Sequence, residues 1–219
     1  MSVTQQPDGY LAIPSSGKGN PVLVLHAWWG LNDTIKAFCD RLANEGYVVF
    51  AADLYHGKVT DQISEAEVLA PALGKKHEQT VSELADAVAF LQEKAGVDDS
   101  GITVIGFSLG AFYALELSNN APEDINGVVV FYGTGADDFS KSNAEYLGHF
   151  AENDPYEPPE VSKDLEDMLK SAGRPATIYT YENTGHWFFE PDRKDAYNEA
   201  AAKLAWERTL EFLKRFATS

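Results

Sequence analysis

Short apolar runs alternate with longer, partly polar stretches along the chain, and this alternation predicts strands separated by helices. The runs at 21–26 and 47–52 are continuously apolar, which is typical of strands buried on both faces of a sheet. Residues 10–14 form a shorter run before a cluster of turn residues, and we expect an edge strand there. Further strands are predicted at the start of 102–112 and over residues 125–131, 146–151 and 176–181.

Apolar residues at helical spacing mark the segments between these strands. Ile35, Phe38, Cys39 and Leu42 follow an i, i+3, i+4, i+7 pattern, which predicts a helix that ends near Gly46. Further helices are predicted over residues 61–96 with a break near Gly74, directly after residue 108, and over about 160–172 and 192–216.

Strands that alternate with helices pair in parallel through right-handed crossovers. We therefore predict an α/β fold with a mostly parallel sheet flanked by helices, in one domain spanning residues 1–219. In such a sheet every loop from a strand to the next helix lies at the same edge. Ser108, Asp154 and His186 all lie in loops of this kind, and we expect them to converge.

Residues 102–112 read Ile-Thr-Val-Ile-Gly-Phe-Ser-Leu-Gly-Ala-Phe, a strand that breaks into a glycine-flanked serine and then a helix. The spacing of Gly106, Ser108 and Gly110 fits a nucleophile elbow, in which both flanking positions must be too small to collide across the turn. The helix that follows directs its free NH groups toward the serine. The NH of Leu109 is therefore placed to stabilise an oxyanion.

A serine hydroxyl needs a base within hydrogen-bond reach and a third group that orients the base. His186 is the best base among the five histidines, because it lies in a loop after a strand and comes last in the order serine, acid, histidine. For the acid, Asp154 fits this order better than Asp53, which comes too early. The paired Asp137 and Asp138 are typical of a solvated loop.

The composition narrows the functional class. The chain has 34 acidic and 17 basic residues, giving a net charge of −17, which disfavours nucleic-acid and membrane partners. No apolar run approaches the roughly 18–20 residues that span a bilayer, and no basic region precedes an apolar stretch at the N-terminus, so we expect a cytoplasmic protein. The single cysteine, Cys39, excludes an internal disulfide and fits a reducing compartment.

Six segments, in the same order and over nearly the whole chain, resemble the dienelactone hydrolase family, whose members have the α/β-hydrolase fold. They are His26-Ala-Trp-Trp-Gly-Leu-Asn32, Asp53-Leu-Tyr55, Gly106-Phe-Ser-Leu-Gly110, Tyr132-Gly133 with Gly135, Gly148-His-Phe-Ala-Glu-Asn-Asp154 and Gly185-His-Trp-Phe-Phe189. The resemblance implies a Ser108, Asp154, His186 triad and an oxyanion hole formed by the NH groups of Leu109 and Trp28. It also implies no metal and no organic cofactor.

The chain departs from that family at three positions. Characterised members carry a cysteine nucleophile where this chain has Ser108, and a glutamate that interacts with the thiol where this chain has Ala27. They also use an arginine to hold the substrate's carboxylate at the position of Glu190, so we expect an anionic substrate in this pocket to face the Glu190 carboxylate. We therefore expect a serine hydrolase that cleaves small esters or lactones through an acyl-enzyme, with a preference for uncharged substrates.

Aromatic residues gather near the predicted site, and some of them are expected to form a compact apolar pocket while the rest pack in the core. The candidate pocket residues are Trp29, Tyr55, Tyr132, Trp187 and Phe188. The segment 56–76 is a candidate cover over this pocket. The same triad would serve a thioesterase or a peptidase, and the same fold would serve a protein that only binds. A nucleotide-binding domain is disfavoured, since Ala-Trp-Trp-Gly is too bulky for a pyrophosphate loop.

Overall fold

In a computed structural model of the chain, residues 5–96 and 101–216 are described, so the ends of the predicted domain and residues 97–100 lie outside these ranges. The strands are β1 (Gly9–Ala12), β2 (Pro21–Leu25), β3 (Val48–Ala52), β4 (Ile102–Phe107), β5 (Ile125–Phe131), β6 (Glu145–Ala151) and β7 (Ala176–Tyr181). The helices are α1 (Asp33–Asn44), α2 (Ile63–Gly74), α3 (His77–Ala95), α4 (Leu109–Asn120), α5 (Pro159–Ser171), α6 (Glu199–Leu213) and the short 3₁₀ helix η1 (Lys214–Phe216).

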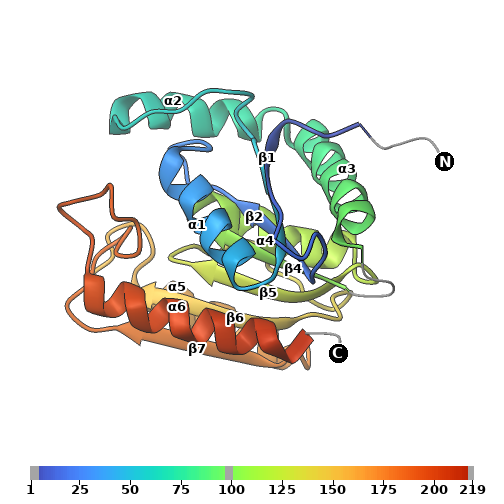
Figure 1. Cartoon of the computed structure of the whole chain (residues 1–219). Coiled ribbons are helices and arrows are strands. Elements are labelled where there is room, and N and C mark those ends of the chain that lie inside the picture. Colours follow the sequence, from blue (N-terminus) through green and yellow to red (C-terminus); the bar gives the residue numbers. More distant parts are fainter. Residues whose placement is uncertain (1–4, 97–100, 217–219) are drawn as a thin grey trace.

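These strands form one sheet in the order β1-β3-β2-β4-β5-β6-β7. β1 pairs antiparallel with β3 at the edge of the sheet, and all the other pairings are parallel. The carboxyl ends of β2 to β7 therefore lie along one edge of the sheet. Figure 1 shows the arrowheads of β5, β6 and β7 pointing toward that edge, where the long loop before α6 also lies. The structure confirms the predicted α/β-hydrolase sheet.

Both faces of the central strands are buried, as their continuous apolar runs predict. Along β2, Val22 and Val24 pack with α1 and α6 in one hydrophobic cluster. Leu23 and Leu25 face the opposite layer, formed by α3, α4 and α5. Figure 1 shows α1 and α6 in front of the sheet with α4 and α5 behind it. The central strands are therefore a rigid support, covered on both faces, for the loops at their carboxyl ends.

The last helix is shorter than the sequence predicts. It begins at Glu199 and not near residue 192, because the preceding residues form turns in which Ala196 and Tyr197 donate backbone NH groups to Arg193. The Asn198 side chain then accepts from the NH of Ala201 and starts the helix. No helix in the described part of the chain is long and apolar enough to cross a bilayer.

The segment predicted as a cover contains a loop and α2. The loop is held to the body of the protein, because Thr60 donates its NH to the carbonyl of Trp29 at 2.9 Å and Arg193 donates to the carbonyl of Asp61 at 3.1 Å. In α2, Ala66 is fully buried, whereas Val68 is 68% exposed. The helix therefore presents one narrow face to the protein and leaves apolar surface outside.

Candidate active site

Ser108 occupies a sharp turn between β4 and α4, with φ 48° and ψ −111°. A positive φ is disfavoured for any residue with a Cβ, and in this region costs about 1–3 kcal/mol unless the surroundings impose it. The surroundings do so through backbone hydrogen bonds, since Ser108 donates its NH to Phe131 at 2.9 Å and accepts from the NH of Ala111 at 2.8 Å. The predicted strand, elbow and helix are all present.

The glycines on either side of Ser108 are required by close backbone packing. A Cβ on Gly106 would lie 2.6 Å from the NH nitrogen of Ala111 in the following helix. A Cβ on Gly110 would lie 2.6 Å from the carbonyl carbon of Leu25. Gly110 thus lets the start of α4 rest directly against the end of β2. This contact brings Leu109 close to the loop after β2 that carries Trp28.

The three residues predicted to converge are joined by two successive hydrogen bonds. Ser108 Oγ is 2.9 Å from His186 Nε2, and His186 Nδ1 is 2.7 Å from Asp154 Oδ2. Asp154 and His186 are each only 5% exposed. The second oxygen of Asp154 accepts the backbone NH groups of Tyr156 at 2.9 Å and Glu157 at 3.0 Å. A carboxylate held this way keeps Nδ1 protonated, which leaves Nε2 free to accept the serine proton.

Backbone contacts between the loops after β6 and β7 place the acid beside the histidine. Asn153 donates its NH to the carbonyl of Thr184 at 2.9 Å, one residue before Asp154 and two before His186. Asn183, with φ 54°, donates its NH to the Glu152 carboxylate at 2.8 Å. The short turn that carries the histidine is therefore fixed to the loop that carries the acid.

The two candidate oxyanion donors lie at the beginning of α4 and after β2. Leu109 is the first residue of α4, where the NH has no acceptor within the helix. Trp28 lies two residues after His26. The His26 side chain is buried and neutral, because burial lowers its pKa. His26 Nδ1 donates to the carbonyl of Ala27 at 2.6 Å, and Nε2 accepts the NH of Leu54 at 3.1 Å. These bonds fix the loop that carries Trp28 to the end of β3.

Aromatic side chains surround His186 on its outer side. The ring centroids of Trp187 and Tyr156 lie 4.8 Å and 5.0 Å from that of His186. Trp28 contacts both rings, at 5.9 Å from Trp187 and 5.7 Å from Tyr156. Tyr156 is 48% exposed and was not among the residues predicted from the sequence. Its only sequence signal is its position two residues after Asp154, within a proline-rich loop.

The predicted pocket residues divide between the surface of the site and the core behind it. Trp187 is partly exposed and contacts Trp29, which is itself buried. Tyr132 and Phe188 are fully buried and pack against each other at 5.6 Å. Both rings therefore lie behind the exposed surface of the site, where Phe188 fills the space beneath the loop after β7.

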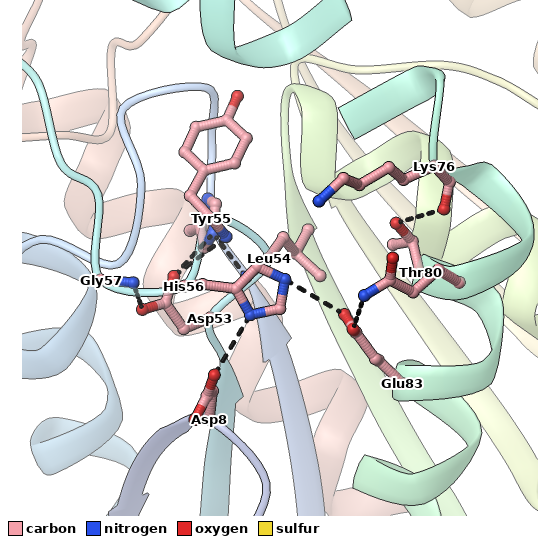
Figure 2. A network of polar contacts seen from close by, with 11 residues as sticks. Asp8, Asp53, Leu54, Tyr55, His56, Gly57, Lys76, Thr80 and Glu83 are labelled. Carbon is pink, nitrogen blue, oxygen red and sulfur yellow. Dashed lines mark hydrogen bonds and ion pairs between the residues drawn. The ribbon is translucent and has the colours of Figure 1, made fainter. Parts of the chain in front are cut away.

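Tyr55 also lies away from the triad. Its ring contacts His26 at 5.0 Å and borders a cavity of about 90 Å³ between the loop after β3 and helices α2 and α3. Figure 2 shows this region, with His56 between Asp8 and Glu83. Tyr55 belongs to the hydrophobic cluster beneath α3 and α4, so it supports the fold beside the site.

Asp53, the rival candidate for the acid, has a different role. Its two oxygens accept the NH groups of Tyr55 at 3.0 Å and Gly57 at 2.6 Å (Figure 2). These bonds close the turn after β3. No hydrogen bond joins Asp53 to His186 in the described part of the chain, so the geometry favours Asp154.

Two further acidic residues lie near the triad. The sequence led us to expect that Glu190 faces the substrate, but its side chain points into the core and is only 1% exposed. Its Oε1 accepts a hydrogen bond from the Tyr132 hydroxyl at 2.7 Å. Burial raises the pKa of Glu190 to about 8. Glu157 accepts from the hydroxyl and the NH of Thr134, and burial raises its pKa as well. It joins the loops after β5 and β6, and the sequence carried no signal for it.

The fold and the Ser-His-Asp geometry together define a protein of the α/β-hydrolase class. The sequence matches the model of the dienelactone hydrolase family over residues 8–217. The chain therefore belongs to that family, as its motifs predict, and is a hydrolase.

Similarity to individual proteins extends over nearly the whole chain. "Protein usf" of Aquifex pyrophilus is 31% identical over 96% of this chain and 94% of that protein. A "Putative carboxymethylenebutenolidase" of Aquifex aeolicus is 30% identical over 95% of this chain and 93% of that protein. Among solved structures, a dienelactone hydrolase-like promiscuous phosphotriesterase from metagenomic libraries superposes with a TM-score of 0.86 at 20% identity, covering 96% of this chain and 92% of that one.

Proposed function

We propose that this protein cleaves small carboxylic esters or lactones through an acyl-enzyme on Ser108. The observation that carries the proposal is the pair of successive hydrogen bonds, with 2.9 Å from Ser108 Oγ to His186 Nε2 and 2.7 Å from His186 Nδ1 to Asp154 Oδ2. The proposal commits to serine as the nucleophile in a family whose characterised members use cysteine.

Acylation follows from this geometry. Ser108 Oγ attacks the substrate carbonyl carbon while its proton passes to His186 Nε2, and Asp154 stabilises the imidazolium that forms. The carbonyl oxygen becomes an oxyanion that the NH groups of Leu109 and Trp28 stabilise. The carbon–oxygen bond to the leaving group then breaks, and the alkoxide takes the proton from His186. For a lactone, this alkoxide remains on the acyl chain.

Deacylation repeats these steps with water as the nucleophile. His186 takes a proton from the water, and the resulting hydroxide attacks the acyl carbon. The bond to Ser108 Oγ breaks, and the serine recovers its proton from His186. The products are a carboxylic acid and an alcohol, or one hydroxy acid from a lactone. No other reacting group is required.

The surface around the triad favours a small substrate with apolar groups. Trp28, Trp187 and Tyr156 provide aromatic contact beside His186, and no lysine or arginine in the described part of the chain forms a cation–π contact with any of these three rings. The names of relatives support the ester and lactone class. They include a "Probable 2-oxo-3-(5-oxofuran-2-ylidene)propanoate lactonase" of Bradyrhizobium sp, which is 29% identical.

A panel of nitrophenyl esters, neutral and carboxylate-bearing lactones, and thioesters tests the proposal with wild type and Ser108→Ala. We expect the wild type to hydrolyse short neutral esters or lactones best, and the variant to lose about 10⁴–10⁶ in turnover. A Ser108→Ala variant that keeps more than about a tenth of wild-type turnover would exclude Ser108 as the nucleophile.

A further inference from the structure

One buried hydrogen bond outside the triad ties together the loops after β5 and β7. The Tyr132 hydroxyl, after β5, donates to Glu190 Oε1, after β7, at 2.7 Å. The two residues are 0% and 1% exposed. Since they are 58 positions apart in sequence, the bond fixes one loop relative to the other.

The segment that carries Tyr132 touches both residues that transfer the proton in the proposed mechanism. The Tyr132 ring lies 5.0 Å from the His186 imidazole between centroids. Gly133, the next residue, is so close to the elbow that a Cβ added to it would lie 3.0 Å from the Cα of Ser108. Tyr132 has φ 37°, a conformation that a side chain rarely adopts, so its surroundings must hold it in place.

We infer that Glu190 is a positioning residue for catalysis, which holds the Tyr132–Gly133 segment against His186 and Ser108 by anchoring the Tyr132 hydroxyl. The inference rests on the proposed function, because Glu190 acts only through the triad. It also gives a role to a residue that stands where the family has a substrate-binding arginine. In this chain that position faces inward and supports the base.

The charge of Glu190 adds a second consequence. Its Oε2 is buried without a hydrogen-bond partner in the described residues, and burial raises its pKa to about 8. The other titratable groups near it are Tyr132, Asp192 and Arg193, and Asp33 and Arg41 of α1 border the same cavity of about 300 Å³. Glu190 therefore gains a buried negative charge above about pH 8. The Tyr132 ring lies between this carboxylate and the imidazole, since its hydroxyl bonds to Glu190 and its centroid is 5.0 Å from that of His186. The charge should therefore favour the imidazolium that forms on His186 during acylation, and turnover should rise through this pH range.

A double-mutant cycle on kcat and KM for a nitrophenyl ester tests the inference. Tyr132→Phe keeps the ring but removes the hydroxyl, and Glu190→Ala removes the acceptor. We expect each to lower kcat about ten- to a hundredfold, with KM changed less than about threefold, since misplaced reacting groups lose turnover. The double variant should be no worse than the poorer single one, because both remove the same bond.

Two matched variants separate positioning from general damage. Glu190→Gln keeps an acceptor for Tyr132, so it should recover kcat to within about threefold at pH 7 while the rise near pH 8 disappears. Tyr146→Phe removes another buried hydroxyl, bonded to Ser142 and Ser118 at the opposite end of the sheet. It should leave kcat unchanged.

Additive losses in the cycle, a loss confined to KM, or a Glu190→Ala enzyme with wild-type kcat would overturn the inference. If Glu190→Ala does not fold, Tyr132→Phe and the pH profile of Glu190→Gln decide, since wild-type behaviour of both would equally overturn it. If the wild type hydrolyses esters while the Glu190 and Tyr132 variants give these contrary results, only the inference fails and the proposed function stands. A wild type that neither hydrolyses esters nor differs from Ser108→Ala would remove the proposed function and this inference together.

Discussion

At the scale of single residues, Ser108 combines two demands that oppose each other. Its hydroxyl must stand clear of the sheet, and the turn that achieves this gives the residue a φ of 48° and a ψ of −111°, a conformation that glycine adopts far more easily. The tight packing of Gly106 and Gly110 imposes the turn. Ser108, the proposed nucleophile, is therefore a position where backbone strain lowers the stability of the fold.

Substituting Ser108 in two ways separates strain from chemistry. Ser108→Gly and Ser108→Ala should both be inactive, but Ser108→Gly should be more stable than Ser108→Ala by about 1 kcal/mol or more, because only glycine accepts this backbone without strain. Urea unfolding of the two variants measures the difference. Equal stabilities would show that the elbow is unstrained.

The choice of Asp154 as the acid gives a second prediction at this scale. Asp154→Asn should lower turnover by about 10⁴ with little change in KM, because an amide there stabilises the wrong tautomer of His186. Asp53→Asn is the matched control, since Asp53 is also an aspartate at a strand end but its hydrogen bonds go to backbone NH groups of its own turn, and its oxygen lies 3.9 Å from His26 and not beside His186. If Asp53→Asn proved the more damaging change in steady-state assays, the assignment of the acid would be wrong.

Sequence alone indicated the residues that share a motif but not the contacts between distant loops. Ser108 lies two residues from Gly106 and from Gly110, and His186 directly follows Gly185, so both stand in recognisable segments. Parallel topology brings such segments to one edge. The Tyr132–Glu190 bond joins residues 58 positions apart, and no local pattern encodes it. The same reason explains why Glu190 was expected in the pocket and lies in the core.

At the scale of elements, the contact between α4 and β2 sets the position of the proposed oxyanion donors. Gly110 is the contact point, where an added Cβ would lie 2.6 Å from the carbonyl carbon of Leu25. The backbone there cannot yield without moving the start of the helix, and with it the NH of Leu109. Packing between these elements therefore links stability to catalysis.

Replacing glycines by alanine in two helices tests this contact. Gly110→Ala should destabilise the protein by about 1–3 kcal/mol through overpacking and lower kcat as well. Gly74→Ala, at the end of α2, meets nothing within 4 Å and should be neutral or stabilising by up to about 1 kcal/mol. Thermal unfolding and ester hydrolysis measured on both variants check this. A Gly110→Ala protein as stable and active as Gly74→Ala would contradict the proposed contact.

Element boundaries follow from the sequence where a single local signal dominates. The apolar run at 125–131 coincides with β5, and the break near Gly74 separates α2 from α3. The start of α6 was placed too early because residues 192–197 are compatible with a helix by composition. Their turns depend on tertiary contacts, such as the NH of Asn198 bonded to the carbonyl of Phe188, that only the folded chain supplies.

At the scale of the whole molecule, the burial of Glu190 links stability to pH. Its pKa is raised to about 8 in the folded state, above the value near 4.3 of an unfolded chain. The unfolded state therefore loses this proton first, so the fold loses stability as pH rises from about 4 to about 8, and the loss levels off above that. Burial of the carboxylate is the cause.

Glu190→Gln removes this dependence. The variant should gain stability over the wild type as pH rises, by roughly 2–5 kcal/mol at pH 8, with little difference near pH 4. Denaturant unfolding at several pH values measures the gap between the two proteins. A gap that stays constant with pH would show that Glu190 is not buried as an acid.

The central claim is that Ser108 is the nucleophile of an acyl-transfer site, and covalent labelling tests it most directly. A fluorophosphonate reacts with a serine hydroxyl that a neighbouring general base activates. Oγ attacks the phosphorus, fluoride leaves, and a phosphonyl group remains on Oγ. After treatment at neutral pH, intact-mass and peptide mass spectrometry should find one adduct per chain, on the peptide that contains Ser108, and none in Ser108→Ala. An unlabelled wild type, an adduct on another residue, or equal labelling of Ser108→Ala would contradict the account.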